Sequence, residues 1–185
     1  MLVVLTQAAL LGLFGYAAFL RERDGVFWLH PFFMVLAFAF QNVAALVMKQ
    51  KSRSRLLHVA AASCATVCSA VGGYIIFDVK GGTGVPLSQH LNTWHGLIAA
   101  AAASVSVAHA LFACLFLWPG FGFAGSMRRG TRVAVHRLTA RLLLLLYGAS
   151  LLIGLWKVGM TPATLSGAAG FALVLSTGLR TLFVI

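Results

Sequence analysis

Four histidines occupy matching places in four successive apolar segments of this chain. They are His30, His58, His95 and His136. Each lies within about two helical turns of the start of its segment, counted at about 3.6 residues per turn. Neutral imidazole binds transition metals and also relays protons. Because an ionisable side chain inside an apolar membrane segment is costly and usually functional, we expect these four residues to carry the chemistry of the protein.

The composition indicates what surrounds these segments. Of the 185 residues, 61% are hydrophobic and 9% are charged, whereas a soluble domain has roughly a quarter charged residues. So few charges cannot cover a surface that faces water on every side. The apolar runs are continuous rather than alternating, and only helices or closed barrels satisfy the backbone polar groups in lipid. We therefore expect an all-α membrane protein in contact with a lipid bilayer.

The length of the chain limits the number of membrane-spanning helices. A hydrocarbon core about 30 Å thick takes about 20 residues of helix. The sequence therefore predicts six transmembrane helices in a single domain, 1–185, with the histidines on a four-helix core formed by helices two to five, 26–157. The six segments are residues 2–20, 26–48, 57–79, 92–117, 133–156 and 162–183.

Basic residues orient the predicted helices in the membrane. The second and fourth loops hold most of the lysine and arginine, and an excess of these residues marks the cytoplasmic side. Both loops and both termini are therefore expected to be cytoplasmic. Since successive helices run in opposite directions, His30 and His95 should lie near the outer or lumenal face, and His58 and His136 near the cytoplasmic face. The basic residues of this bias are Lys49, Lys51, Arg53, Arg55, Arg128, Arg129, Arg132, Arg137 and Arg141.

The net charge of +11 also raises the question of a nucleic-acid partner. The basic residues flank apolar segments, and no soluble domain combines them with an aromatic platform for bases. We therefore expect no nucleic-acid binding.

The predicted topology arranges the four histidines as two facing pairs at two depths. Iron held by two imidazoles has no open coordination position, so such a site moves electrons and does not readily bind oxygen. The two pairs therefore predict two bis-histidine haems, one above the other in the bilayer, which would transfer electrons across the membrane. Each histidine taken alone could instead be a polar residue at the level of the lipid headgroups, but the joint pattern favours haem.

Two more histidines stand outside this pattern. His109 follows His95 by fourteen residues, which on a helix is roughly 21 Å deeper and only about 40° round the axis. It competes with His58 for the inner haem; we prefer the pair of His58 with His136 and expect His109 to be a buried polar residue. His90 precedes the fourth helix, where it could contact an outer substrate or a haem edge, and an exposed loop histidine is an equal alternative.

At these residues the chain resembles the eukaryotic cytochrome b561 family. The most specific matches are Leu29-His30-Pro31-Phe32-Phe33-Met34 and His90-Leu91-Asn92-Thr93-Trp94-His95-Gly96, because they include neighbours of the ligands. The basic run that ends in Arg55-Leu56-Leu57-His58 and the pair His136-Arg137 add to them. The resemblance covers about residues 26–157 and is strongest to the compact branch with the tumour-suppressor-type cytochrome b561 domain proteins.

The resemblance implies two haem b groups, with His30 and His95 as the axial ligands of one iron and His58 and His136 as those of the other. It implies a transmembrane oxidoreductase of the ascorbate-dependent ferrireductase or monodehydroascorbate reductase type. One electron would pass from cytosolic ascorbate to monodehydroascorbate or a ferric chelate on the outer side, with no catalytic side chain besides these ligands. We expect the protein in an endomembrane or the plasma membrane. A homodimer is compatible with the resemblance.

Three residues are candidates for binding the anionic groups. In relatives that use ascorbate, basic residues ahead of the third-helix ligand help to bind this donor, and Lys49 and Arg53 fall at about the matching spacing. Contact with lipid headgroups is an alternative role for both. Arg137, directly after a predicted ligand, could pair with a haem propionate.

Two other functions compete with this one. A cytochrome b subunit that exchanges electrons with quinone and a partner protein would use the same ligands. A transporter or channel would use the histidines to relay protons or bind a metal ion, but transition-metal transport usually brings carboxylates into the membrane. None of the three acidic residues lies well inside a predicted segment; they are Glu22, Asp24 and Asp78.

Overall fold

The computed structural model of the protein describes residues 26–48, 54–117, 123, 126–157, 159 and 165–184. No strand occurs among these residues. In chain order the elements are the 3-10 turn η1 (Val26–Trp28), α2 (Leu29–Val47), α3 (Arg55–Val79), the 3-10 turn η2 (Gly82–Gly84), the short α4 (Leu87–His90), α5 (Trp94–Phe112), the π-helical turn η3 (Ala113–Leu117), α6 (Arg129–Lys157) and α7 (Leu165–Val184).

Four helical stretches in the described part of the chain are long and apolar enough to cross a membrane. They are Val26–Val47, Arg55–Val79, Trp94–Leu117 and Arg129–Lys157. Their bounds agree with predicted segments two to five to within about one helical turn, so the predicted all-α membrane fold with its four-helix core is confirmed. Helix α7 covers most of predicted segment six, and predicted segment one lies outside the described residues.

Hydroxyl side chains fix the start of two core helices. The Oγ atom of Ser54 accepts a hydrogen bond from the backbone N–H of Leu57 at 3.1 Å, directly before α3. The Oγ1 atom of Thr93 accepts one from the backbone N–H of Gly96, also at 3.1 Å, directly before α5. Each bond satisfies a donor that the first turn of a helix leaves unpaired. The caps thereby place His58 and His95 in the first turns of their helices.

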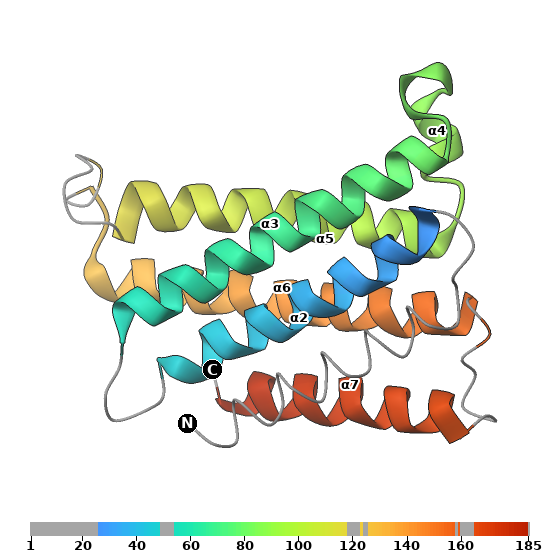
Figure 1. The fold of residues 1–185 in the computed structure, drawn as a ribbon. Helices are drawn as coiled ribbons and strands as arrows, with labels where there is room; N and C mark the ends of the chain where they lie inside the picture. The colour runs from blue at the N-terminus through green and yellow to red at the C-terminus, as the bar shows by residue number, and fades with distance from the viewer. Residues whose placement is uncertain are drawn as a thin grey trace.

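The core helices run side by side in alternating directions, and α7 lies against α2 and α6 on the side away from α3 and α5 (Figure 1). Helix α2 packs mainly on α3, and α5 packs mainly on α6, so the core consists of two helical hairpins joined where α2 meets α6. In contrast, α2 with α5 and α3 with α6 are not among the helix pairs that pack closely on each other. These are the two helix pairs that carry the predicted pairs of histidines.

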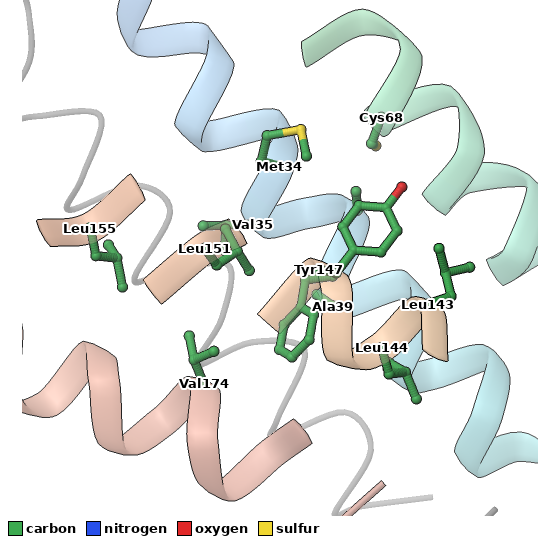
Figure 2. Packing of buried hydrophobic residues seen from close by; sticks show 12 residues of the cluster. Met34, Val35, Ala39, Cys68, Leu143, Leu144, Tyr147, Leu151, Leu155 and Val174 are labelled. Carbon is green, nitrogen blue, oxygen red and sulfur yellow. The ribbon is translucent and has the colours of Figure 1, made fainter. Parts of the chain in front are cut away.

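Buried apolar side chains fill the space between α2 and α6, with contributions from α3 and α7 (Figure 2). Tyr147 of α6 lies at the centre of this core and points its hydroxyl toward α3, where it contacts the Oγ atom of Ser69. Phe38 of α2 is fully buried in the same cluster. Because lipid is as apolar as these side chains, close packing and interhelical hydrogen bonds hold such helices together.

A polar contact joins α7 to α2 within this apolar core. The hydroxyl of Thr181 on α7 is hydrogen-bonded to Oδ1 of Asn42 on α2. The Nδ2 atom of Asn42 donates to the backbone carbonyl of Phe38 at 2.7 Å. Both Asn42 and Thr181 are buried, so the contact satisfies groups that lipid could not solvate and holds α7 at one register against the core.

Gly72 permits the close approach of α2 and α3. A Cβ atom at this position would lie 3.1 Å from Sδ of Met34 and 3.2 Å from Cβ of Phe33. At the neighbouring Gly73, which is exposed, an added Cβ would meet no atom within 4 Å. The two glycines therefore differ in packing although they share a helix.

This difference predicts unequal effects of one substitution at the two positions. We expect Gly72→Val to lower the free energy of unfolding in detergent micelles by about 1–3 kcal/mol, because the larger side chain forces α2 and α3 apart. The matched control Gly73→Val should change it by less than about 0.5 kcal/mol. Equal losses, measured by thermal or denaturant unfolding, would contradict the assigned helix contact.

Candidate functional site: two facing pairs of histidines

The first pair of histidines lies between the start of α2 and the start of α5. The ring centres of His30 and His95 are 6.0 Å apart, and the ring planes are nearly perpendicular at 83°. The Nδ1 atom of His30 lies 2.8 Å from the backbone carbonyl oxygen of Gly72 on α3. The Nδ1 atom of His95 lies 3.0 Å from the carbonyl oxygen of Ser150 on α6. Each ring is thus held by the backbone of a neighbouring helix.

The second pair lies at the other end of the four helices, between α3 and α6. The ring centres of His58 and His136 are also 6.0 Å apart, with an angle of 75° between the planes. The Nδ1 atom of His58 lies 2.8 Å from the carbonyl oxygen of Ala44 on α2. The Nδ1 atom of His136 is buried and has no hydrogen-bond partner among the described residues. The two pairs therefore share one spacing but differ in how one ring is held.

The hydrogen bonds define the tautomers of three rings. A carbonyl oxygen can only accept, so the Nδ1 atoms of His30, His58 and His95 must carry the proton and donate it. The neutral ring then has its free lone pair on Nε2. Histidines that bind a metal through one nitrogen commonly donate a hydrogen bond from the other in this way, which orients the ring and raises its basicity. These three rings are therefore prepared to act as ligands through Nε2.

The spacing of each pair fits one metal ion between two imidazoles. Two nitrogens on opposite sides of a metal ion lie about 4 Å apart at a metal–nitrogen bond of about 2 Å. Each ring centre lies about 1 Å behind its nitrogen, as expected from carbon–nitrogen bonds of about 1.3–1.5 Å. The expected separation of about 6 Å agrees with both pairs. Two axial imidazoles share the metal axis, so this arrangement leaves the angle between their planes free.

The pairs lie at two depths, linked by one repeated spacing. Ala44, whose carbonyl bonds His58, follows His30 on α2 by fourteen residues, and Gly72, whose carbonyl bonds His30, follows His58 on α3 by the same number. Ser150, which bonds His95, follows His136 on α6 again by fourteen. Fourteen helical residues span about 21 Å. Each of these three helices, α2, α3 and α6, therefore carries a histidine at one site and a supporting carbonyl at the other.

Close approach around the first pair depends on a small residue, Gly154, whose role the sequence alone does not indicate. A Cβ atom on Gly154 of α6 would lie 3.2 Å from Cε1 of His95. The supporting groups at Gly72, Ala44 and Ser150 also escaped notice, because every residue has a carbonyl. The fourteen-residue spacing from each histidine is the one sequence signal that could have found them.

His90 is the last residue of the short helix α4, ahead of α5, and is buried with 7% of its surface exposed. Its Nε2 atom lies 3.0 Å from the carbonyl oxygen of Gly82, and its ring stacks on Phe77 with centres 4.4 Å apart. Lys80 donates from Nζ to the carbonyl of His90 at 3.0 Å. The alternative of an exposed loop histidine is wrong, because these contacts fold the ring against α3. The contact of His90 with a substrate stays a prediction.

A groove of about 470 Å³ opens beside the first pair. Its lining includes His95, Trp94, Trp156 and Lys157. The two tryptophans are largely exposed, as is common for tryptophan at the level of the lipid headgroups. A small molecule at this end of the protein could therefore approach one edge of His95.

The ring of His109 stacks on the ring of His136, so its nitrogens do not point toward those of His136. The two rings are stacked, with centres 4.4 Å apart and an angle of 21° between the planes. The Nδ1 atom of His109 lies 2.7 Å from Oγ1 of Thr139. Stacked rings do not direct their nitrogens at a common metal ion between them, whereas the spacing of His58 and His136 allows it. The structure thus places His109, the expected competitor of His58 for the inner haem, next to the second pair, but with its ring stacked on His136.

Of the remaining candidates, Arg137 is among the described residues. Arg137 is exposed on α6 directly after His136. Lys49 and Arg53 lie outside the described residues. Exposed arginines at this end of the helices include Arg55 and Arg129, so the described part of this end is basic.

Comparison with known proteins identifies the architecture. The family model for eukaryotic cytochrome b561 matches residues 29–161, which is more than half of the chain and includes all four paired histidines. No curated protein and no solved structure matched the chain.

Proposed function

Because the chain belongs to the eukaryotic cytochrome b561 family, whose members transfer electrons through haem across a membrane, we propose that it uses two haem b groups to carry electrons from cytosolic ascorbate to an outer acceptor. The acceptor is monodehydroascorbate or a ferric chelate. The protein is thus an ascorbate-dependent transmembrane oxidoreductase in an endomembrane or the plasma membrane.

The proposal rests above all on the equal spacing of the two histidine pairs. His30 and His95 would hold one haem iron, and His58 and His136 the other, since both pairs of ring centres are 6.0 Å apart. Haem iron held by two imidazoles accepts and releases one electron without an open coordination position. The three Nδ1 hydrogen bonds to carbonyls support the proposal, because they leave Nε2 as the ligand atom.

The depth of the two pairs supports transfer across the bilayer. The fourteen-residue spacing separates the two ends by about 21 Å along the helices, a large part of a hydrocarbon core about 30 Å thick. Buried side chains such as Phe38 and Tyr147 fill the middle of the helix bundle and exclude water there. An electron that crosses works with or against the membrane potential by about 2.3 kcal/mol per 100 mV.

Charge at the second pair supports an anionic donor. Arg55, Arg129 and Arg137 are exposed at this end of the described helices, and a basic surface raises the local concentration of an anion such as ascorbate. By the positive-inside bias this end is cytoplasmic. Arg137 would pair with a haem propionate, while Lys49 and Arg53 would bind ascorbate. His90 and the groove beside His95 belong to the end where the acceptor would bind.

The haem content of purified variants tests the ligand pairs. We expect a reduced-minus-oxidised visible spectrum with low-spin b-type bands and two haems per chain. His30→Ala or His95→Ala should remove one haem, and His58→Ala or His136→Ala the other, because each iron loses an axial ligand. The control Ser104→Ala, an exposed position on α5, should keep both. A protein without haem would refute the function, and retention of two haems in any of the four histidine variants would refute that ligand.

The donor is tested by the rate at which ascorbate reduces the haems. Lys49→Ala and Arg53→Ala should each raise the half-saturating ascorbate concentration about two- to fivefold, because one ion pair in water contributes up to about 1 kcal/mol. Reduction by dithionite should be unchanged. The control Arg180→Ala, exposed on α7, should leave the ascorbate dependence as it is. Slow reduction by ascorbate and fast reduction by a quinol would instead favour a quinone-linked cytochrome b.

A further inference from the structure

Helix α5 departs from the fourteen-residue pattern that the other three core helices share. On α2, α3 and α6, the residue fourteen positions after the histidine supplies its carbonyl to a histidine of the other pair. On α5 the residue at that position, fourteen after His95, is His109. By the pattern its partner would be His136, whose buried Nδ1 atom has no hydrogen bond within the described residues. The ring of His109 contacts the ring of His136 instead, at 4.4 Å between centres.

A hydrogen bond to Thr139 holds the ring of His109 in place. The hydroxyl of Thr139 has one proton, which it donates within α6 to the carbonyl of Val135 at 3.0 Å or of His136 at 3.1 Å. With the proton directed to a carbonyl, the hydroxyl accepts from Nδ1 of His109, 2.7 Å away. In this arrangement the His109 ring carries its proton on Nδ1. Since Thr139 lies three residues after His136 on the same helix, this bond fixes His109 against the turn that presents His136.

A histidine meets two needs at this position that other residues meet only singly. A flat ring is required for the stack, in which the planes of His109 and His136 differ by 21°. A hydrogen-bonding nitrogen is required for the contact with Thr139, inside a segment where lipid offers no substitute partner. Phenylalanine would provide the ring alone, and asparagine would provide the donor alone.

We propose that His109 is the positioning residue of His136: held by Thr139, it stacks on the His136 ring and fixes the orientation that carbonyl hydrogen bonds fix in His30, His58 and His95. The inference rests on the proposed function, in which His136 is an axial haem ligand. It assigns to His109 no bond to the iron. The orientation of an axial imidazole affects both the electron paramagnetic resonance (EPR) spectrum and the midpoint potential of the haem, so both should respond to changes at His109.

The test compares variants in the His30→Ala background, which by the proposed function retains only the haem of His58 and His136. His109→Leu should keep this haem but shift its EPR g-values and its midpoint potential, because the stack is lost. His109→Phe and Thr139→Val should give smaller shifts, since one keeps the ring and the other keeps the histidine. The controls Ser104→Ala on α5 and Thr66→Val on α3 are exposed, and Thr66 makes the same bond to the carbonyl four residues earlier; neither should shift anything.

Several results would overturn the inference. An unchanged spectrum and potential in His109→Leu would show that the stack does not position His136. Loss of the haem in His109→Leu with its retention in His136→Leu would make His109 the ligand. If His109→Leu does not fold, unchanged values in both His109→Phe and Thr139→Val would overturn it equally. Absence of haem from the wild-type protein would instead refute the proposed function itself.

Discussion

The hydrogen bond from a histidine Nδ1 to a carbonyl on a neighbouring helix is the interaction on which the two sites depend. It gives each ring one orientation, it leaves Nε2 free for a metal, and it joins two helices at a defined register. The bonds of His30 to Gly72 and of His58 to Ala44 join α2 and α3 at both ends. Sliding one helix by a single residue would displace each acceptor by about 1.5 Å and about 100° round the axis. The register of the hairpin and the geometry of the sites are therefore one constraint.

Much of this arrangement could be predicted from the sequence. Continuous apolar runs predicted the spans, since lipid leaves few choices for the backbone. The alternation of helix direction placed His30 near His95 and His58 near His136, and the observed ring distances agree with this. The positions of the histidines in the apolar segments and the alternating helix direction carried that inference without any knowledge of packing.

The sequence could not predict the features that depend on packing between helices. Helical periodicity placed His109 at the depth of the second pair. Whether its nitrogens point toward His136 or its ring stacks on the His136 ring depends on how α5 and α6 pack. The sequence predicted His90 to be a loop residue. In the structure, Gly81 and Gly82 have positive φ angles and turn the chain so that the His90 ring stacks on Phe77. The carbonyl acceptors have no side-chain signature. Each of these outcomes follows from contacts between segments far apart in the chain.

The two sites are similar in spacing and different in support, and this difference bears on function. Three of the four rings are held by backbone carbonyls. The fourth, His136, is held by a stacked side chain that is itself fixed by Thr139. The site nearer the basic end therefore has a proposed ligand whose surroundings can be altered by side-chain substitution. The site beside the Trp94 and Trp156 groove does not share this feature among the described residues.

Electron transfer across a sealed membrane tests the central claim most directly. The protein would be reconstituted in lipid vesicles that enclose ascorbate, with the impermeant acceptor ferricyanide outside. We predict that ferricyanide is reduced at a rate proportional to the protein content, and that His30→Ala and His58→Ala each abolish it because each removes one of the two sites. Transfer at the wild-type rate by either variant would contradict the claim that both pairs carry the electron.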